Sequence, residues 1–327
     1  MAHSVLFARH LRLSSVIALS GVPVALMACQ FSPPAQVIAA DGVLCDLTRR
    51  LAAADVSVDC LLQPGDDPHQ FRLTPGHGRA LRQASLVLIN GYDLTPALAG
   101  QPDVVAVAER AVPDSPHLDA DHNADPSSDH RHGDRDPHVW HDPGQAAAMV
   151  QRVAEQLQQR QPSARAAMAA RAAAMVDVLE QLDRWNRRQF ATIPGDRPLA
   201  TGHRAFASLA RAYDLREWPV VDAMSSSDSL RPQAFLSVLA DLRREKVPML
   251  FPEQWPPSKA LLRIQALSGV PLAPAALVAD GLAPASDGSA DLVSTLTANT
   301  CLIVEGLNGR CDRQGQAALI RQWRRIP

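Results

Sequence analysis

Two copies of the tripeptide Asp-Pro-His are the strongest chemical signal in this sequence of 327 residues. One copy ends at His69 and the other at His138. Proline fixes its own backbone and disfavours helix at the residue before it, so each histidine follows a stiff segment. Because a metal-binding imidazole must be neutral and held in one orientation, both residues are candidate metal ligands.

A third histidine, His203, follows Thr201 and Gly202 at the point where a predicted strand gives way to a helix. Open α/β sheets bind their ligands at such junctions. For any one of these histidines alone, a surface or capping role is the simpler interpretation. Three histidines at equivalent junctions instead favour one shared site for a divalent metal.

Residues 113–137 are rich in Asp, His, Ser and Pro and almost lack apolar side chains, which predicts a mobile loop. Imidazoles and carboxylates on a flexible tether bind metal weakly and exchange it quickly, so the loop histidines are auxiliary candidates. The alternative is a solvated linker with incidental histidines. The candidates are His117, His122, His130 and His132, mixed with Asp114, Asp119, Asp121, Asp125, Asp129 and Asp134.

The elements that must position these residues alternate between strand and helix, which predicts parallel α/β packing. In the first half, strands are predicted at 36–40, 56–62 and 85–89, and helices at 44–54 and 74–83. In the second half, strands are predicted at 199–201, 217–221, 248–251 and 270–272, and helices at 204–213, 232–245, 258–267, 290–303 and 314–325.

Two further helices are predicted between the halves, because the Ala-rich stretch from Pro143 to Phe190 has helical apolar spacing and is divided at Pro162. The second of them would span roughly 42 Å at about 1.5 Å per residue, which is long enough to connect two domains. We therefore predict an N-terminal lobe over 29–161, a linking helix over 162–190 and a C-terminal lobe over 191–327.

The segment 1–28 is predicted to be a signal peptide, because basic residues precede a short apolar stretch that glycine and proline interrupt. Leu26-Met27-Ala28-Cys29 resembles a bacterial lipobox and predicts lipidation of Cys29, although Met27 replaces the usual small residue. We therefore expect an exported protein, either periplasmic or tethered to a membrane as a lipoprotein.

The other four cysteines predict two disulfides in an exported chain, and three connectivities are open from the sequence alone. The pairs that are close in sequence, Cys45–Cys60 and Cys301–Cys311, are the expected ones. A cysteine zinc site is disfavoured because the sequence has no CxxC motif.

Five short stretches of the sequence, including those that contain His69, His138 and His203, resemble the motifs of the substrate-binding proteins of ABC-type zinc and manganese importers and occur in the same order. The matching stretches are Leu62-Gln63-Pro64-Gly65-Asp66-Asp67-Pro68-His69, Asp136-Pro137-His138-Val139-Trp140-His141-Asp142-Pro143, Gly202-His203-Arg204-Ala205-Phe206, Lys246-Val247-Pro248 and Phe251-Pro252-Glu253. The resemblance implies two α/β lobes joined by one long rigid helix, with the metal held between the lobes.

The resemblance also implies ligands from four loops, of which His69, His138 and His203 match the first three. The fourth ligand of the family is usually an acid late in the second lobe, a place that Asp280 occupies here. Asp-Gly is also a common turn pair, so a turn role for Asp280 is one alternative. Glu253 is the rival acid, and a water molecule that completes the shell is a further alternative.

One residue departs from the family pattern. The family usually has an apolar residue between the tryptophan and the Asp-Pro of the second motif, where this chain has His141. Exposure to solvent is the favoured interpretation of this imidazole, and a role as an auxiliary ligand is the alternative.

The expected function is high-affinity capture of a divalent transition metal and its delivery, by a monomer, to the membrane permease of an ABC importer. Zinc is favoured because nitrogen donors dominate the site and zinc-type members often carry a histidine-rich loop. The alternatives are manganese or iron binding, a zinc-dependent hydrolase and a metal-binding surface adhesin. An enzyme is not expected, because the sequence has no HExxH motif. Binding to nucleic acid is not expected either, because the net charge of −2 gives no overall positive potential.

Overall fold

The computed structural model describes residues 37–101, 103–118, 135–221, 232–284 and 290–327. The predicted signal peptide, the lipidation residue Cys29 and the loop histidines His122, His130 and His132 lie outside these ranges. Within these ranges, no helix combines the length and the apolar composition that crossing a membrane requires.

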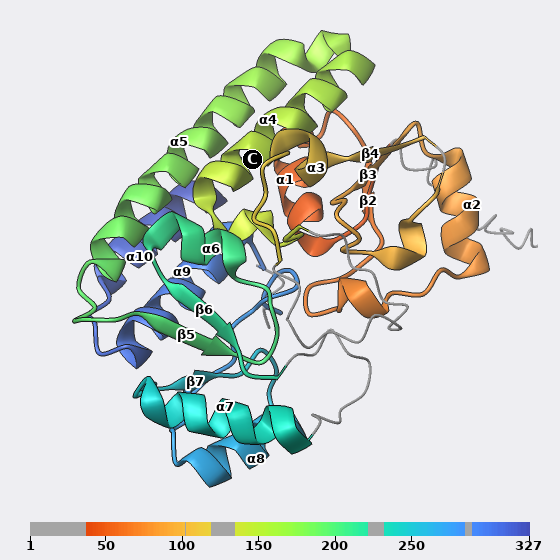
Figure 1. The fold of residues 1–327 in the computed structure, drawn as a ribbon. Helices are drawn as coiled ribbons and strands as arrows, with labels where there is room; N and C mark the ends of the chain where they lie inside the picture. The colour runs from red at the N-terminus through yellow and green to blue at the C-terminus, as the bar shows by residue number, and fades with distance from the viewer. Residues whose placement is uncertain (1–36, 102, 119–134, 222–231, 285–289) are drawn as a thin grey trace, which may run out of the picture. The chain divides into compact units, whose positions relative to one another are not determined.

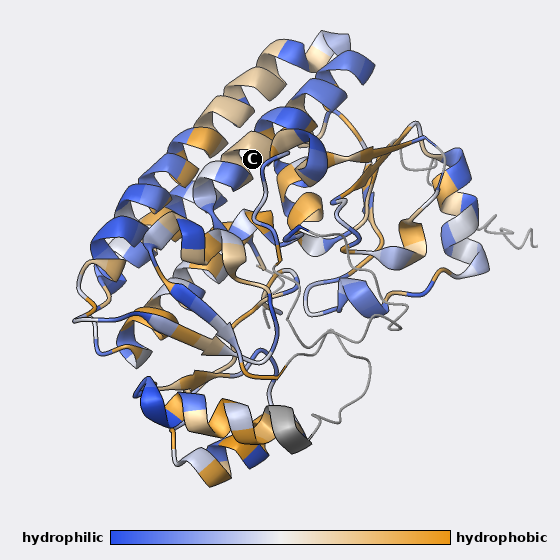
Figure 2. Cartoon of the chain, viewed as in Figure 1, coloured by the Kyte–Doolittle hydropathy of each residue, from blue (hydrophilic) through white to orange (hydrophobic). Residues whose placement is uncertain are grey.

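The first sheet has four parallel strands in the order β2-β1-β3-β4 (Figure 1). The strands are β1 (Val37–Ala39), β2 (Val58–Cys60), β3 (Leu86–Ile89) and β4 (Val104–Ala106). Short apolar runs are typical of buried parallel strands, and Figure 2 shows hydrophobic residues along this sheet. The accompanying helices are α1 (Gly42–Ala52), α2 (Pro75–Gln83), the one-turn η2 (Pro96–Leu98) and α3 (Val107–Ala111).

The second sheet has three parallel strands in the order β6-β5-β7. The strands are β5 (Pro198–Thr201), β6 (Arg216–Pro219) and β7 (Leu250–Phe251). Helix α6 (Ala207–Tyr213) connects β5 to β6, and α7 (Pro232–Arg244) and α8 (Lys259–Ser268) flank β7 in the sequence. The parallel α/β packing that the alternation predicts is therefore present in both halves.

Four further helices complete the fold, and α4 and α5 lie side by side along one edge of the molecule (Figure 1). They are α4 (Pro143–Arg160), α5 (Arg165–Phe190), α9 (Leu292–Gly306) and α10 (Arg313–Arg324). Asp142 caps α4 by accepting from the Gly144 amide, and Pro143 occupies the first turn, where its missing N–H costs nothing. The one-turn η4 (Pro162–Ala164) separates α4 from α5, as the proline predicts.

Helices α5 and α9 each contribute to the hydrophobic cores around both sheets. Leu182 of α5 and Leu296 of α9 belong to the cluster of the first sheet. Phe190 and Ile303, further along the same two helices, belong to a cluster of the second sheet. The long helix thus has buried contacts at both ends, while the lobe boundary placed at residue 191 stays a prediction.

Two features of the sheets differ from the sequence expectation. The sequence does not predict β4 and α3, because three strand residues followed by a five-residue helix without a side-chain cap give no periodic signal. The strand predicted at 270–272 is reduced to one bridge between Leu250 and Leu272. Pro271 has no amide hydrogen, so it cannot donate to a longer ladder.

Both expected disulfides are present. Cys45 of α1 is bonded to Cys60 of β2, and Cys301 of α9 is bonded to Cys311, which precedes α10. The Cα–Cα separations are 5.7 Å and 5.2 Å. Each bond therefore ties a helix to its neighbouring segment within one part of the fold.

Candidate metal centre

The two Asp-Pro-His tripeptides fold into the same local turn. In the first, His69 lies in the one-turn helix η1 (Pro68–Gln70), and Asp67 accepts a hydrogen bond from the His69 amide at 2.9 Å. In the second, Asp136 accepts the equivalent bond from the His138 amide, also at 2.9 Å. An aspartate that binds the amide two residues ahead closes a tight turn, and the intervening proline presets φ. Local chemistry alone therefore positions the backbone of each histidine.

The second turn is buried and is braced by segments that are distant in the sequence. Asp136 is fully buried and accepts from the amide and the hydroxyl of Ser208 in α6, at 2.9 Å and 2.7 Å. Asn90, which follows β3, donates to the carbonyl of Pro137 at 2.8 Å. His138 itself immediately precedes the one-turn helix η3 (Val139–His141). Two segments that are distant in the sequence thus hold this turn in place.

The carboxylate of Asp136 also orients the imidazole of His138. His138 Nδ1 lies 3.0 Å from Asp136 Oδ1, and because an ionised carboxylate only accepts, Nδ1 is the donor. When the ring is neutral, its lone pair is therefore on Nε2, which faces Asp280 at 3.0 Å. A carboxylate behind a metal-binding imidazole fixes the tautomer and raises the basicity of the ligand.

His203 is positioned by Glu253, which follows β7. Oε1 of Glu253 accepts from the amides of Gly202 and His203 at 2.7 Å and 3.1 Å, and it lies 3.5 Å from His203 Nδ1. A Cβ at position 202 would collide with the Glu253 carboxylate, which explains the glycine before this histidine. Glu253 therefore fixes His203 through contacts with both its backbone amide and its Nδ1 atom.

Asp280 lies in a segment without regular secondary structure, and neighbouring elements hold this segment in place. The Leu277 amide donates to the carbonyl of Pro252 at 2.8 Å. The Asn299 side chain, on α9, accepts from the Val278 amide at 2.9 Å and donates to the Val278 carbonyl at 2.8 Å. These bonds hold the backbone on the N-terminal side of Asp280.

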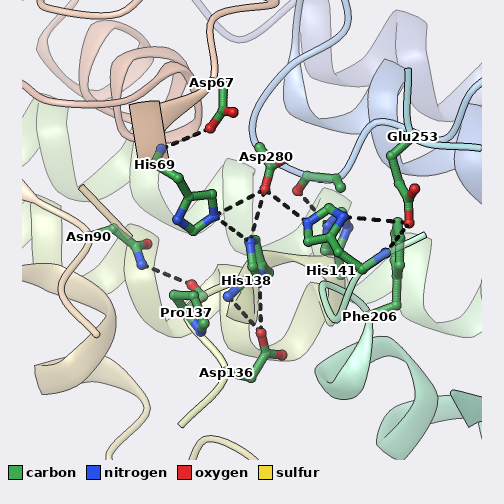
Figure 3. A network of polar contacts seen from close by, with 12 residues as sticks. Asp67, His69, Asn90, Asp136, Pro137, His138, His141, Phe206, Glu253 and Asp280 are labelled. Carbon is green, nitrogen blue, oxygen red and sulfur yellow. Dashed lines mark hydrogen bonds and ion pairs between the residues drawn. The ribbon is translucent and has the colours of Figure 1, made fainter. Parts of the chain in front are cut away.

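Four side chains from four segments converge at one point, where Figure 3 shows the rings of His69 and His138 pointing toward Asp280. Asp280 Oδ1 lies 3.3 Å from His69 Nε2, 3.0 Å from His138 Nε2 and 3.4 Å from His203 Nε2. The Nε2 atoms of His69 and His138 are 3.3 Å apart. His69, His138 and Asp280 offer donor atoms that all lie within 4.8 Å of one another, and His203 joins the group through Asp280.

The four side chains differ in their access to solvent. Exposed fractions are 3% for His138, 18% for His203, 22% for His69 and 24% for Asp280. His138 therefore forms the closed base of the site, and the other three side chains line its accessible side.

The electrostatics of the site favour a positive charge at its centre. Burial opposes charge on His138, but its hydrogen bonds to Asp136 and Asp280 outweigh burial and raise its pKa to about 9. Burial acts on His203 in the same way, and the nearby carboxylates, above all Asp280, raise its pKa well above the ordinary value. Burial alone would raise the pKa of Asp280, yet the surrounding imidazoles hold that pKa well below its usual range. Protons on His138 and His203 thus supply the positive charge that a bound cation would supply.

The favoured interpretation of His141 as a solvent-exposed residue is wrong. Its relative exposure is 1%, and its Nε2 lies 2.9 Å from the carbonyl oxygen of Ala279. Its ring packs against Phe206 with 4.7 Å between centroids. Burial, followed by the nearby charge of His138, lowers the pKa of His141 to about 4, so the ring is neutral at physiological pH. The physical reason is that η3 turns this side chain inward.

Of the loop candidates, only His117 lies in the described residues, where it is not part of the donor group, and the sequence misses some supporting residues. The backbone of His117, the one loop histidine in the described residues, forms an isolated antiparallel β-bridge with Arg135. Ser208 and Asn90 carry no functional signal in the sequence, because their contacts with the second turn arise only on folding. The aspartate of each tripeptide, by contrast, is visible in the sequence as part of the repeated motif.

Comparison with known proteins gives these features a family context. Residues 37–306 match the family described as ZnuA, zinc-uptake complex component A periplasmic. The zinc-binding protein TroA of Treponema pallidum is 29% identical over 283 residues, which cover 83% of this chain and 88% of TroA. The manganese ABC transporter substrate-binding lipoprotein PsaA of Streptococcus pneumoniae is 24% identical over 278 residues, which cover 84% of this chain and 89% of PsaA.

Solved structures agree on the fold. The periplasmic zinc-binding protein TroA from Treponema pallidum matches with a TM-score of 0.72 and 27% identity, over 84% of this chain and 99% of that chain. Fe(III)-bound YtgA from Chlamydia trachomatis matches with a TM-score of 0.73 and 24% identity, over the same shares of the two chains. The predicted two-lobe α/β fold with parallel sheets and a long helix is therefore confirmed. Because the family match covers most of its length, the chain belongs to the ZnuA family of periplasmic metal-uptake components.

Proposed function

We propose that this protein captures a divalent transition metal, with zinc as its cargo, outside the cytoplasm and delivers it to an ABC-type importer. One observation carries the proposal: three imidazole Nε2 atoms converge on a single carboxylate oxygen of Asp280. The relatives named above are a zinc-binding protein, a manganese transporter component and a protein solved with bound Fe(III). Metal capture for import is therefore the function that both the site and the family support.

The spacing of the His69, His138 and Asp280 donor atoms fits three positions of a tetrahedral shell around a small ion. Zn–N and Zn–O bonds of about 2.0–2.1 Å place neighbouring tetrahedral ligands about 3.3–3.4 Å apart. The donor atoms of His69, His138 and Asp280 lie 3.0 to 3.3 Å apart, and His203 Nε2 lies 3.4 Å from Asp280 Oδ1. An ion at the centre would replace the contact between the Nε2 atoms of His69 and His138 by two coordinate bonds.

The donor types favour zinc over manganese as the cargo. Three imidazole nitrogens and one carboxylate suit a borderline ion in a four-coordinate shell, whereas manganese favours more oxygen donors. Asp280 is the better candidate than Glu253 for the carboxylate. The reason is that Oε1 of Glu253 already accepts two backbone hydrogen bonds, while Oδ1 of Asp280 faces all three imidazoles.

We propose a transport role without catalysis. A catalytic zinc keeps an open coordination position for water, and four protein donors at this site leave none in a tetrahedral shell. Glu253 would be the candidate general base, but its contacts with the Gly202 and His203 amides give it a positioning role. Members of this family act as transporter components.

The proposed setting is the space outside the cytoplasmic membrane, with the permease of an ABC importer as the partner of a monomeric carrier. PsaA, the relative from Streptococcus pneumoniae, is named as a lipoprotein, which supports lipidation of Cys29 as the anchor of this chain. Fractionation of cells that express the full chain tests the anchor. We expect the wild-type protein with the membranes and a Cys29→Ala variant unprocessed or released.

Metal analysis and competitive titration test the binding function. Metal-free protein titrated with zinc against a chromogenic chelator should bind one ion tightly, and His138→Ala should abolish that tight binding. His77→Gln is the matched control, because His77 caps α2 through the Thr74 amide and a glutamine can take the same capping position. A wild-type protein without tight binding, or tight binding retained in His138→Ala, would contradict the proposal.

A growth experiment tests the choice of metal. Deletion of the gene should impair growth under zinc chelation, and added zinc should restore growth where added manganese does not. Restoration by manganese alone would show that the cargo is manganese, and the ligand set would then need a separate test by the titration above.

A further inference from the structure

His141 is a buried polar residue that the proposed metal site does not use as a ligand. It lies at the end of η3, three residues after His138, and its Nε2 is 2.9 Å from the carbonyl oxygen of Ala279. A carbonyl oxygen only accepts, so Nε2 carries the hydrogen and donates it. Figure 3 shows His141 beside Phe206, on the same side of the site as Glu253.

The carbonyl that His141 binds belongs to the peptide bond immediately before Asp280. Fixing that carbonyl fixes the plane of the peptide that leads into the Asp280 backbone. Ala279 is 2% exposed and His141 is 1% exposed, so water cannot readily take the place of the imidazole. The bond thus connects the second Asp-Pro-His segment to the segment that carries the proposed carboxylate ligand.

Two contacts join these segments, and a metal ion affects them differently. The contact of His138 Nε2 with Asp280 Oδ1 is between two proposed ligands, so an incoming ion takes its place. The contact of His141 Nε2 with the Ala279 carbonyl uses no donor that the ion needs. The second contact is therefore compatible with both the metal-free and the loaded site.

We propose that His141 is a positioning residue that keeps the Asp280 segment against the second Asp-Pro-His turn, so that the metal site is preformed. The proposal rests on the proposed function, since it concerns the same site. A preformed site loses less conformational freedom on binding, and once loaded it must break the His141 bond before Asp280 moves away. His141 therefore slows release of the metal.

Metal-release kinetics with a donor-retaining control test this proposal. We expect His141→Phe, which keeps the aromatic volume but leaves the Ala279 carbonyl unpaired, to release zinc to excess chelator about tenfold faster than wild type. His141→Gln, whose Nε2 can donate in the same place, should release zinc within about threefold of the wild-type rate. Equal rates for His141→Phe and wild type would overturn the proposal, and so would equal acceleration in both variants.

A measurement on the wild-type protein keeps the proposal testable if His141→Phe does not fold. Imidazole nitrogen NMR should show the Nε2–H tautomer of His141 both without and with zinc. A shift of His141 Nε2 to a metal-bound position on zinc addition would make this residue a ligand and overturn the positioning role. Failure of wild type to bind zinc would instead contradict the proposed function, so the two failures are distinguishable.

Discussion

The two Asp-Pro-His turns have the same three residues and the same internal hydrogen bond, yet they lie in different surroundings. The side chain of His69 is 22% exposed and that of His138 is 3% exposed. The second oxygen of Asp67 accepts from the nearby Gln70 side chain, whereas that of Asp136 accepts from Ser208 in another part of the fold. Equal local sequence thus gives equal turns, and tertiary surroundings make one ligand accessible and the other fixed.

Removing the imidazole of each turn separately should give the largest effects on zinc affinity and on stability. His69→Ala and His138→Ala should each weaken zinc affinity by orders of magnitude, because each removes a proposed ligand. Only His138→Ala should also strongly destabilise the metal-free protein, by about 3–5 kcal/mol, since it leaves the buried Asp136 charge without its partner. Chemical denaturation of the metal-free variants measures this difference, and equal losses would show that the two turns are equivalent.

The pH dependence of zinc affinity should be steep above neutrality. The raised pKa of His138, about 9, means that zinc must displace a proton from this ring at pH 7. Affinity should therefore rise by about tenfold per pH unit between pH 7 and 9 for each displaced proton, and the raised pKa of His203 adds to this slope. Titration in buffers of different ionisation enthalpy counts the protons released, and a flat profile above pH 7 would contradict the charged state of His138.

The same pKa shift has a consequence for the metal-free fold. The folded pKa of His138 lies above its ordinary value of 6.5, so its stabilising contribution is complete below pH 6.5 and is lost as pH rises toward 9. His141 acts in the opposite direction, because its pKa is lowered to about 4 and its contribution is lost as pH falls from 6.5 toward 4. Metal-free stability should therefore decline on both sides of neutrality, and denaturation across this range measures it.

Replacing the aspartate of each turn should have an intermediate effect on zinc affinity, and the effect should differ between the two turns. Asp136→Asn should lower zinc affinity by about 10- to 100-fold, because the group behind a metal-binding imidazole sets its tautomer and basicity. Asp67→Asn should change the affinity little, since Asp67 binds the His69 amide and Gln70, and an asparagine oxygen can accept the same amide bond. Competitive titration compares the two variants, and a similar loss in both would refute the distinct role of Asp136.

The smallest effect is expected from the histidine-rich loop. Replacing 119–134 with two glycines should leave the tight site unchanged and remove only weak secondary binding. Deleting 115–135 should be more damaging, because Ser115 donates to the Asp136 carbonyl at 2.6 Å and Arg135 donates to the Ser115 carbonyl at 2.6 Å. Calorimetric titration of the two deletions separates the loop from its bracing ends, and loss of tight binding in the shorter deletion would give the loop a direct role.

Most of the elements and the histidine ligand candidates were predictable from the sequence because their signals are local. Thr74 and Pro75 mark the start of α2, and Pro162 marks the break between α4 and α5. The Asp-Pro-His repeat similarly contains its own turn chemistry within three residues. Asp280 had no such signal, since Asp-Gly is typical of ordinary turns, and it was placed at the site through resemblance to a family.

The sequence by itself determined the backbone turns that present His69 and His138, because hydrogen bonds and proline geometry within each tripeptide are sufficient for them. Only the tertiary structure decided that Ser208 braces Asp136, that His141 is buried, and that Asp280 faces three imidazoles. These contacts join residues that are 72, 138 and up to 211 positions apart, counting from His69 to Asp280 for the last. These contacts depend on how both sheets pack against the shared helices, and no local pattern of residues encodes that packing.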